Sequence, residues 1–452
     1  MARFLFTIQI SDDLGLLTRS LPIARELAGR GHEVAFCNPA RAPSRVIAEA
    51  SFPNLPVCHP LYLLMDLGSR GELNPPGLLR AARAGRFRED FGGLRRFLGQ
   101  LLSLIPTRLP NPTADVYSLD HFLATLGIVS ARYVRAETAG LRRLMEEWRP
   151  DVVVDFWNPA ACLAARSLRL PLATVIQADL HPANPGFIWW KEPPPRLPTV
   201  TPAFNRVLAE YGLAPLRRTE DLFVGDLTLV VGRPETDPLP PGTGAAHVGA
   251  ILWQKEGVLL PGWVDALGRD RPLVWLYLGN PRYFAFTTPL DTHILLRTCV
   301  EVLADEDVQV VLTLGHHDRP RSLGTLPANV RIAPYLPGLE MAARSDLLIH
   351  HGGYGSCQTG LYVGTPAVIL PTFSERESNA RRVAGVGAGD FLVPGMHWVW
   401  RRDVPAEALR GKIRQVLADP TYRQRARQAG ERLRAYGGAA EAARKIAGLL
   451  LG

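Results

Sequence analysis

The sequence predicts an α/β protein with two doubly wound, Rossmann-like domains of parallel sheet that face each other across a cleft. Three observations lead to this prediction. The chain has 452 residues, too many for one hydrophobic core. In both halves, short apolar runs typical of buried strands alternate with segments of helical periodicity. A stretch rich in proline and glycine separates the halves at 233–270.

This stretch divides the chain. Residues 1–232 are the expected first domain, 233–270 the interdomain linker and 271–430 the second domain. Residues 431–452 are expected to form a C-terminal helix that can pack back toward the first domain.

The strands of the first domain are expected where apolar, β-branched residues follow a break. They are predicted at 3–10, 32–38, 150–156 and 171–176, with helices at 16–31 and 160–168. Proline, glycine and arginine interrupt this pattern at 68–112, and aromatic residues and prolines interrupt it at 184–198. Both segments are predicted to be irregular insertions with short helices.

The second domain repeats the alternation of strand and helix. Strands are predicted at 273–278, 308–314, 330–332, 347–350 and 367–370, and long helices rich in Ala, Arg and Leu fill 405–451. Ligands of such sheets bind beyond the carboxyl ends of the strands, so a site is expected in the cleft.

The net charge of +8 comes mainly from arginine, much of it at 80–96 and 401–434. We interpret these stretches as solvated helix faces. Nucleic acid is disfavoured as a partner because no nucleic-acid-binding motif accompanies the charge. Peripheral contact with an anionic membrane surface stays open, and nothing in the sequence indicates an oligomeric state.

The five cysteines are scattered and form no CxxC pair, which favours a reducing compartment. No apolar run approaches the ~18 residues of a membrane helix, and the first residues do not follow the pattern of a cleavable signal. We therefore expect a cytoplasmic protein.

The most informative segment is 346–383. A buried strand ends at His350-His351, a Gly352-Gly353-Tyr354-Gly355 turn follows, and a helix starts there. Glycines let the backbone approach a ligand, and the start of a helix attracts anions such as a diphosphate. His351 can donate a further hydrogen bond, and Ser356 can cap the helix or contact a phosphate.

The whole segment resembles the donor-binding signature of family 1 glycosyltransferases, especially the macrolide and antibiotic enzymes of bacteria and their plant relatives. The matching residues are His351, Gly353, Ser356, Gly364-Thr365-Pro366, Pro371 and Asn379-Ala380-Arg381-Arg382-Val383. Upstream, 276–280 is similar to the turn that opens the family's C-terminal domain. The segment 331–337 takes the place of the family's base-stacking segment, which implicates Tyr335.

The resemblance implies a GT-B fold and inverting, metal-independent transfer from a UDP- or TDP-sugar to a hydroxyl of a small lipophilic or phenolic acceptor. The nucleotide sugar is a co-substrate, and no cofactor is implied. Helix dipole and backbone donors would stabilise the leaving diphosphate. The donor-binding residues implied are Gly279, Asn280, Tyr335, Leu336, His351, Gly353, Gly355, Ser356, Thr359, Glu375 and Arg376.

The sequence departs from the family pattern at three places. Thr359 replaces the ribose-binding Glu of the plant enzymes, and Glu375-Arg376 replaces the sugar-reading Asp-Gln pair. Glu375 can still accept from sugar hydroxyls, whereas Arg376 either reads an acidic sugar or turns away to pair with a carboxylate. Leu16 stands where the family has its catalytic His.

A different catalytic base is therefore needed near the first loop. Asp13 is our first candidate, Asp155 the second and Asp12 the third. A carboxylate base suits a phenolic acceptor, because it is weak toward an alcohol. Asp12 and Asp13 can instead simply cap the following helix. We do not read these acids as a metal site.

Phe156, Trp157 and Trp189 are candidate walls of an acceptor pocket, although aromatic residues serve equally often in plain packing. Because Leu16 replaces the His, two alternatives stay open. One is a catalytically silent homologue that acts as a binding or accessory protein. The other is an NDP-sugar epimerase on the same fold.

Overall fold

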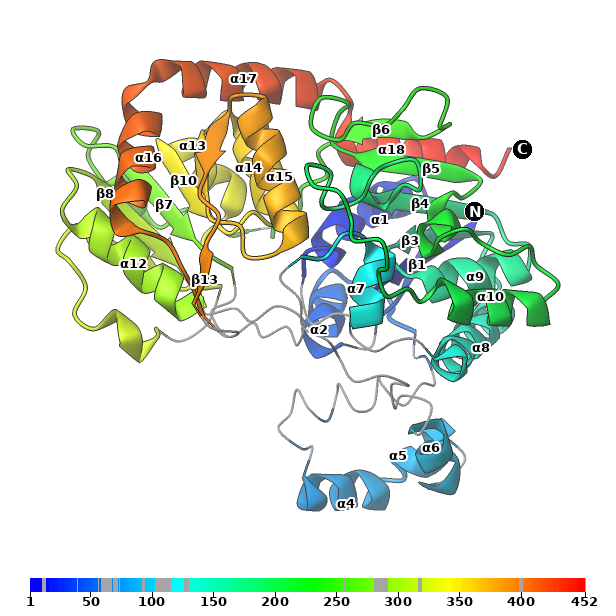
Figure 1. Ribbon diagram of the computed structural model, residues 1–452. Helices are drawn as coiled ribbons and strands as arrows, with labels where there is room; N and C mark the ends of the chain where they lie inside the picture. The colour runs from blue at the N-terminus through cyan, green and yellow to red at the C-terminus, as the bar shows by residue number, and fades with distance from the viewer. Residues whose placement is uncertain are drawn as a thin grey trace.

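The computed structural model describes residues 1–451 except 10–13, 39, 56, 58–66, 68–71, 73, 92–93, 102–114, 126–129, 256, 280–291, 316–318 and 398–400. Two α/β lobes lie side by side, each with a central sheet and helices on both faces (Figure 1). The predicted fold class is confirmed.

The first sheet has six parallel strands in the order β2-β1-β3-β4-β5-β6. They are β1 (Arg3–Ile8), β2 (Glu33–Cys37), β3 (Val152–Phe156), β4 (Leu172–Ile176), β5 (Leu227–Val231) and β6 (Ala246–Gly249). Leu5 of β1 lies opposite Ala35 and Val153, so the apolar runs share one register. Neither β5 nor β6 was predicted. β6 lies inside the range expected to be a linker, and the first sheet continues to Gly249.

The second sheet also has six parallel strands, in the order β12-β11-β10-β7-β8-β9. They are β7 (Leu273–Tyr277), β8 (Gln309–Thr313), β9 (Val330–Ala333), β10 (Leu347–His350), β11 (Ala367–Ile369) and β12 (Gly389–Phe391). The five strands predicted here are confirmed, and β12 adds an edge. A hairpin of β13 (Gly395–His397) and β14 (Arg401–Asp403) lies beside the sheet.

Both lobes contain many helices. In the first lobe they are α1 (Leu17–Gly29), α2 (Arg41–Glu49), α4 (Pro75–Arg83), α5 (Arg86–Phe91), α6 (Leu94–Leu101), α7 (Leu119–Thr125), α8 (Ala131–Trp148), α9 (Pro159–Ser167), α10 (Thr201–Glu210), η2 (Ala178–Leu180) and η3 (Thr219–Phe223). In the second lobe they are α11 (Gly262–Asp265), α12 (Thr292–Ala304), η4 (Arg321–Leu323), α13 (Gly338–Arg344), α14 (Tyr354–Val363), α15 (Ser374–Gly385), α16 (Ala406–Ala418) and α17 (Pro420–Arg434).

The end of the chain returns to the first lobe. After α17 runs along one side of the molecule, α18 (Gly438–Gly448) lies against α1 (Figure 1). Its Ala442, Ala443 and Ile446 are buried in the same apolar cluster as Leu17 and Leu21 of α1. The chain therefore crosses between the lobes twice, once before the second sheet and once after it.

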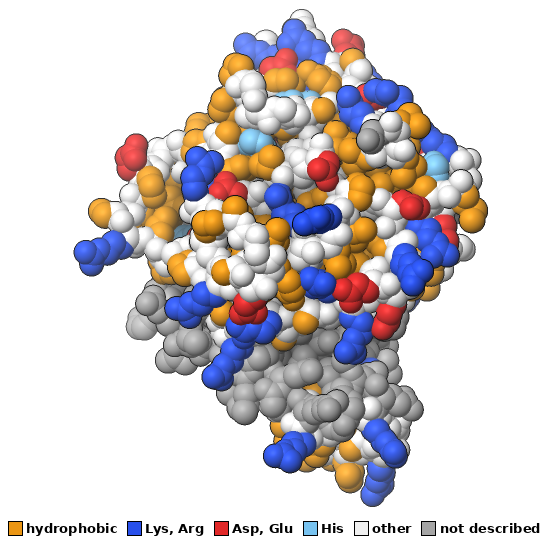
Figure 2. Space-filling view, turned by 90° about the vertical axis from the view of Figure 1, so that its right-hand side faces the viewer, with side chains coloured by type: hydrophobic (Ala, Val, Ile, Leu, Met, Phe, Trp, Pro, Cys, Tyr) orange, Lys and Arg blue, Asp and Glu red, His pale blue; other side chains and the backbone are white. Residues whose placement is uncertain are grey.

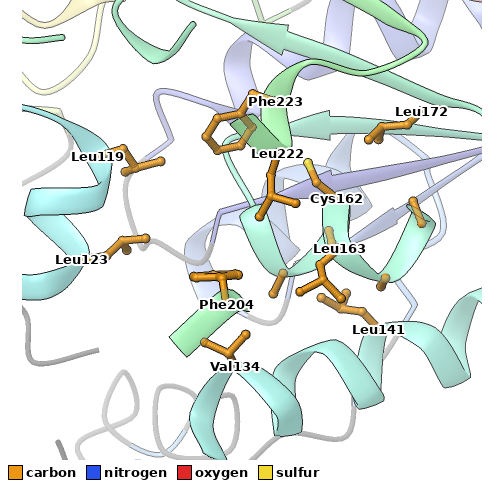
Figure 3. Packing of buried hydrophobic residues seen from close by; sticks show 14 of the residues in the cluster. Leu119, Leu123, Val134, Leu141, Cys162, Leu163, Leu172, Phe204, Leu222 and Phe223 are labelled. Atoms are coloured by element: carbon orange, nitrogen blue, oxygen red, sulfur yellow. The ribbon is translucent and has the colours of Figure 1, made fainter. Parts of the chain in front are cut away.

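One face of the first sheet is covered by α1 and α18, and the opposite face by α7 to α10. Figure 3 shows Leu141 of α8, Leu163 of α9 and Phe204 of α10 converging on one apolar cluster. All three side chains are buried. This packing fixes the sheet and, with it, the positions of the loops at the carboxyl ends of the strands.

Most of the two basic stretches is helical, and several of their arginines form ion pairs. Arg80 pairs with Glu72, and Arg410 and Arg414 both pair with Glu306. On the face shown in Figure 2, Lys and Arg side chains are interspersed with acidic and apolar ones. Within the described ranges, no helix combines the length and apolar character that a bilayer span requires.

Two of the buried carboxylates in the first lobe lie on its sheet and on α8. Burial raises the pKa of Glu137, on α8, from 4.5 to about 7, with a further contribution from the charge of Asp155. Burial likewise raises the pKa of Asp155, on β3, to about 7. Asp155 accepts hydrogen bonds from Thr7 Oγ1 at 2.7 Å and from the Asn158 backbone N–H at 3.0 Å, so it ties β1 to the start of α9.

Glu137→Gln should flatten the pH dependence of stability. Because folding raises the pKa of Glu137, the folded chain binds a proton that the unfolded chain releases. The contribution of this proton to the free energy of unfolding is complete below about pH 4.5 and is lost as the pH rises to about 7. Gln keeps the shape without the charge, so the unfolding free energy of the variant should fall less across this window. Urea unfolding at a series of pH values measures how the unfolding free energy changes with pH.

Glu146→Gln is the matched control, because Glu146 lies on the same helix with an exposed side chain. Its pH profile should follow the wild type. Parallel profiles for wild type and Glu137→Gln would contradict the assignment.

Candidate functional site

The centre of the candidate site is the turn from β10 to α14. At Gly352 φ is +83°, and an added Cβ would lie 2.7 Å from the Arg376 carbonyl oxygen. At Gly353 an added Cβ would lie 2.5 Å from His351 Nε2. Both positions therefore need glycine for space, and Gly352 also needs it for its backbone conformation.

The start of α14 is suited to an anion. No side chain from the described part of the chain caps it, and its first turn has no acidic residue. The first N–H groups of a helix have no partner within the helix, and they carry the positive end of its dipole. Gly355 lies in this first turn, exposed and with open space around it. A phosphate group can therefore approach the backbone here.

His351 forms one wall of the turn. Its ring is buried and stands edge-on to Tyr277, with ring centroids 5.8 Å apart. Burial, followed by the charges of Arg376 and His350, holds its pKa well below the usual range, whereas a hydrogen bond with the Tyr277 backbone acts in the opposite direction. Nδ1 has no hydrogen-bond partner among the described residues. A buried polar atom without a partner is costly, and a ligand would satisfy it.

Gly279, after β7, closes over the same ring. Its φ is +82°, and an added Cβ would lie 3.3 Å from His351 Cε1. The loops after β7 and β10 therefore meet at His351, at the carboxyl edge of the second sheet. This is the place where such sheets bind ligands.

Tyr354 anchors the turn to the first lobe. Its ring is buried in the apolar cluster that also contains Leu17 and Val231. Its hydroxyl donates to the Val231 carbonyl oxygen at 2.5 Å, and the Arg19 guanidinium lies over its ring at 5.0 Å. The turn from β10 to α14 is therefore in contact with both lobes.

Helix α15 docks on the first lobe through a buried ion cluster. Arg382 pairs with Asp179, and its second nitrogen lies 3.7 Å from Asp237. Ser378 donates to Asp179 Oδ2 at 3.0 Å and accepts from Trp189 Nε1 at 3.1 Å. The sequence pattern did not reveal Asp179 or Asp237 as interface residues.

Glu375, at the start of α15, is held by amides from both lobes. Its Oε1 accepts from Gln177 Nε2 at 2.9 Å and from Asn379 Nδ2 at 2.8 Å. Asn379 Nδ2 also donates to the Gly352 carbonyl oxygen at 3.0 Å. Arg376 donates to Thr372 Oγ1 at 2.6 Å.

The remaining predicted donor residues fall into three groups. Tyr335, Ser356 and Thr359 are partly buried, and burial raises the pKa of Tyr335. The side chain of Leu336 is buried in a core cluster with Leu273 and Met341, so only its backbone can reach a ligand. Asn280 lies outside the described residues.

The predicted catalytic residues are not brought together in one described site. Asp12 and Asp13 lie outside the described residues. Asp155 is fully buried against Thr7 and Asn158, as described above. Leu16, in the place of the family's His, packs against the cluster around α1.

The predicted acceptor residues have different environments. Phe156 was expected to line a pocket, but its side chain is 1% exposed and stacks on Phe6 in the core. Trp157 has φ +66° and lies under the Arg19 guanidinium at 5.6 Å. Trp189 is 44% exposed and packs at right angles to Trp190. Trp157 and Trp189 are therefore the two that can meet a ligand.

Sequence reasoning missed Arg19 and Gln177. Both are polar residues buried next to apolar elements, Arg19 in the first turn of α1 and Gln177 directly after β4. A buried polar side chain at the carboxyl end of a strand is a usable signal for a site. In the part of the chain that the structure describes, no three His, Cys, Asp or Glu side chains group as metal ligands would.

Residues 297–449 match the family described as erythromycin biosynthesis protein CIII-like, C-terminal domain. The uncharacterized UDP-glucosyltransferase YojK of Bacillus subtilis (strain 168) is 29% identical over 238 residues, which cover 52% of this chain and 55% of YojK. Demethyllactenocin mycarosyltransferase of Streptomyces fradiae is 34% identical over 180 residues, which cover 40% of this chain and 36% of that protein. The aligned parts thus span about half of one relative and about a third of the other.

Among solved structures, the glycosyltransferase SnogD from Streptomyces nogalater superposes with a TM-score of 0.65 at 23% identity, covering 99% of both chains. With its two parallel sheets, the chain has the GT-B fold that the resemblance implied. The resemblance to glycosyltransferases of natural products is confirmed by these relatives.

His351→Ala should weaken the binding of UDP and TDP about ten- to a hundred-fold. The variant loses a hydrogen bond to a charged oxygen, worth ~1.5–3 kcal/mol. A diphosphate also favours the protonated ring, in which both nitrogens donate. Wild-type binding should therefore take up protons near neutral pH, and the variant should not. Calorimetry in buffers of different ionisation enthalpy measures both effects.

Ser44→Ala is a control for this measurement, because Ser44 lies in the first lobe and its hydroxyl hydrogen-bonds with Asn38 and Asn54. Equal affinity and equal proton uptake in wild type and His351→Ala would make His351 a purely structural strand-end residue.

Proposed function

We propose that this chain, whose residues 297–449 belong to the erythromycin biosynthesis protein CIII-like C-terminal family, is a glycosyltransferase that uses a nucleotide-diphosphate sugar. The single observation that supports this best is the turn at Gly352-Gly353. There the start of α14 and His351 Nδ1, neither of which has a side-chain partner among the described residues, meet at the carboxyl edge of the second sheet.

The proposed donor is a UDP- or TDP-sugar. Its diphosphate would lie at the start of α14, where backbone N–H groups and the helix dipole offset the negative charge. These groups would also stabilise the leaving diphosphate, so the proposed transfer needs no metal ion. Tyr335 would stack on the base, and Glu375 would accept from sugar hydroxyls.

The proposed acceptor is a small lipophilic or phenolic molecule with a hydroxyl group. It would bind at the first lobe near Trp157 and Trp189, the two candidate aromatic residues that are not enclosed in the core. The name of the Streptomyces fradiae relative, a mycarosyltransferase of demethyllactenocin, supports an acceptor of the natural-product class. Direct displacement by this hydroxyl would invert the configuration at the sugar carbon.

Leu16 supports a second candidate function, that of a catalytically silent homologue that binds a partner. An epimerase on the same fold is the third. The decisive assay incubates the protein with UDP- and TDP-sugars and a panel of phenols and macrolides. A transferase gives free nucleotide diphosphate and an acceptor whose mass increases by one sugar. An epimerase changes the sugar and keeps the diphosphate attached. No change in any donor would favour the silent homologue.

Asp13→Asn should lower turnover at least ~100-fold and leave UDP and TDP binding intact, because inverting transfer needs a base at the acceptor hydroxyl. The same substitution at Asp12 and at Asp155 tests the other two candidates. Steady-state rates with a phenolic acceptor, together with nucleotide binding, separate a lost base from a damaged donor site.

Asp151→Asn is the control, because Asp151 lies before the amino end of β3 and accepts from the Arg3 backbone N–H. It should keep normal turnover. Near-normal turnover in all three test variants would discard a carboxylate base.

A further inference from the structure

We infer that Gln177 of the first lobe is a positioning residue for donor-sugar recognition, because it holds the Glu375 carboxylate of the second lobe in place. Gln177 acts through Glu375, because its own amide is occupied by Arg19 and Glu375. This inference rests on the proposed function. It adds that the protein distinguishes a nucleotide sugar from a bare nucleotide only when the two lobes are in contact.

The orientation of Gln177 follows from its neighbours. The side chain is fully buried directly after β4. Arg19 donates to its Oε1 at 3.2 Å, and arginine has no acceptor. The amide oxygen must therefore face Arg19, and the NH2 group must face Glu375, to which it donates at 2.9 Å.

Glu375 receives its second support from its own lobe. Asn379, one turn along α15, donates to the same Oε1 and to the carbonyl oxygen of Gly352. The two amides thus occupy one carboxylate oxygen. Among the described residues no group donates to Oε2, and the side chain is partly exposed. Oε2 is the atom left to accept from a sugar hydroxyl.

Arg19 extends the contact to the first loop and to the phosphate-binding turn. Its Nε donates to the Gly15 carbonyl oxygen at 3.1 Å. Its guanidinium lies over the rings of Trp157 and Tyr354. The first loop, the sugar-reading carboxylate and the turn are therefore joined through Arg19 and Gln177.

The charge of Glu375 explains why this support matters. A carboxylate that loses one of its two amide donors at a domain interface is held less firmly in place. Water then replaces the lost hydrogen bond. The diphosphate contacts at α14 do not involve Gln177. A defect at Gln177 should therefore weaken the sugar contacts and spare the nucleotide contacts.

The test is Gln177→Met, which keeps the length of the side chain and removes the amide. Calorimetry on the full chain gives Kd for UDP, UDP-glucose, TDP and TDP-glucose. We expect Kd for the bare nucleotides to stay within about two-fold of the wild type. Kd for the nucleotide sugar that the wild type prefers should rise about ten-fold or more. Gln177→Asn, whose amide is too short to reach Glu375, should behave in the same way and serves if the first variant does not fold.

Ser374→Ala is the matched control. Ser374 is also in the first turn of α15 and accepts an interdomain hydrogen bond from the Val116 backbone N–H at 2.9 Å. It should shift nucleotide and nucleotide-sugar binding together or not at all.

If a folded Gln177 variant keeps the wild-type ratio of Kd for the nucleotide sugar to Kd for its bare nucleotide, the inference is overturned. The same change of ratio in Ser374→Ala would also overturn it. Failure of the wild type to bind any of the four ligands would instead reject the proposed function.

Discussion

The burial of Arg382 between Asp179 and Asp237 is the interaction on which the rest of the site depends. Arginine keeps its charge in any protein environment, so its burial is costly unless the guanidinium is paired and hydrogen-bonded. Burial raises the pKa of Asp179 to about 6 although Arg382 lowers it, and Asp237 contributes in the same direction as burial. A separation of the lobes would break these contacts and expose the charges to water. The cluster therefore specifies how α15 meets the first lobe.

Docking of α15 completes the candidate site of the second lobe. The helix carries Glu375 and Asn379, and its start packs so closely on the turn that Gly352 has no room for a side chain. Tyr354 reaches the other way and inserts into the first lobe. Each lobe thus supplies a part that the other lacks. Such a site can couple binding of the sugar to the contact between domains, without a separate lid.

Local patterns in the sequence were sufficient for most of the fold and for the turn from β10 to α14. Runs such as 347–350 combine apolar, β-branched composition with a glycine break, and both signals are local. β6 was missed because its short run, Ala246–Gly249, follows prolines and glycines that read as a linker. Phe156 and Leu336 have the same composition whether they line a site or a core, so only packing separates the two. The pairing of Gln177 with Glu375 joins residues 198 positions apart, and no local pattern contains it.

The central claim is that a nucleotide diphosphate binds at the turn between β10 and α14, in contact with both lobes. A crystal structure of the protein with UDP or TDP tests it most directly. We expect diphosphate oxygens within hydrogen-bond distance of the first backbone N–H groups of α14 and of His351 Nδ1, and the base beside Tyr335. A nucleotide bound elsewhere, with this turn empty and His351 Nδ1 still without a partner, would contradict the account.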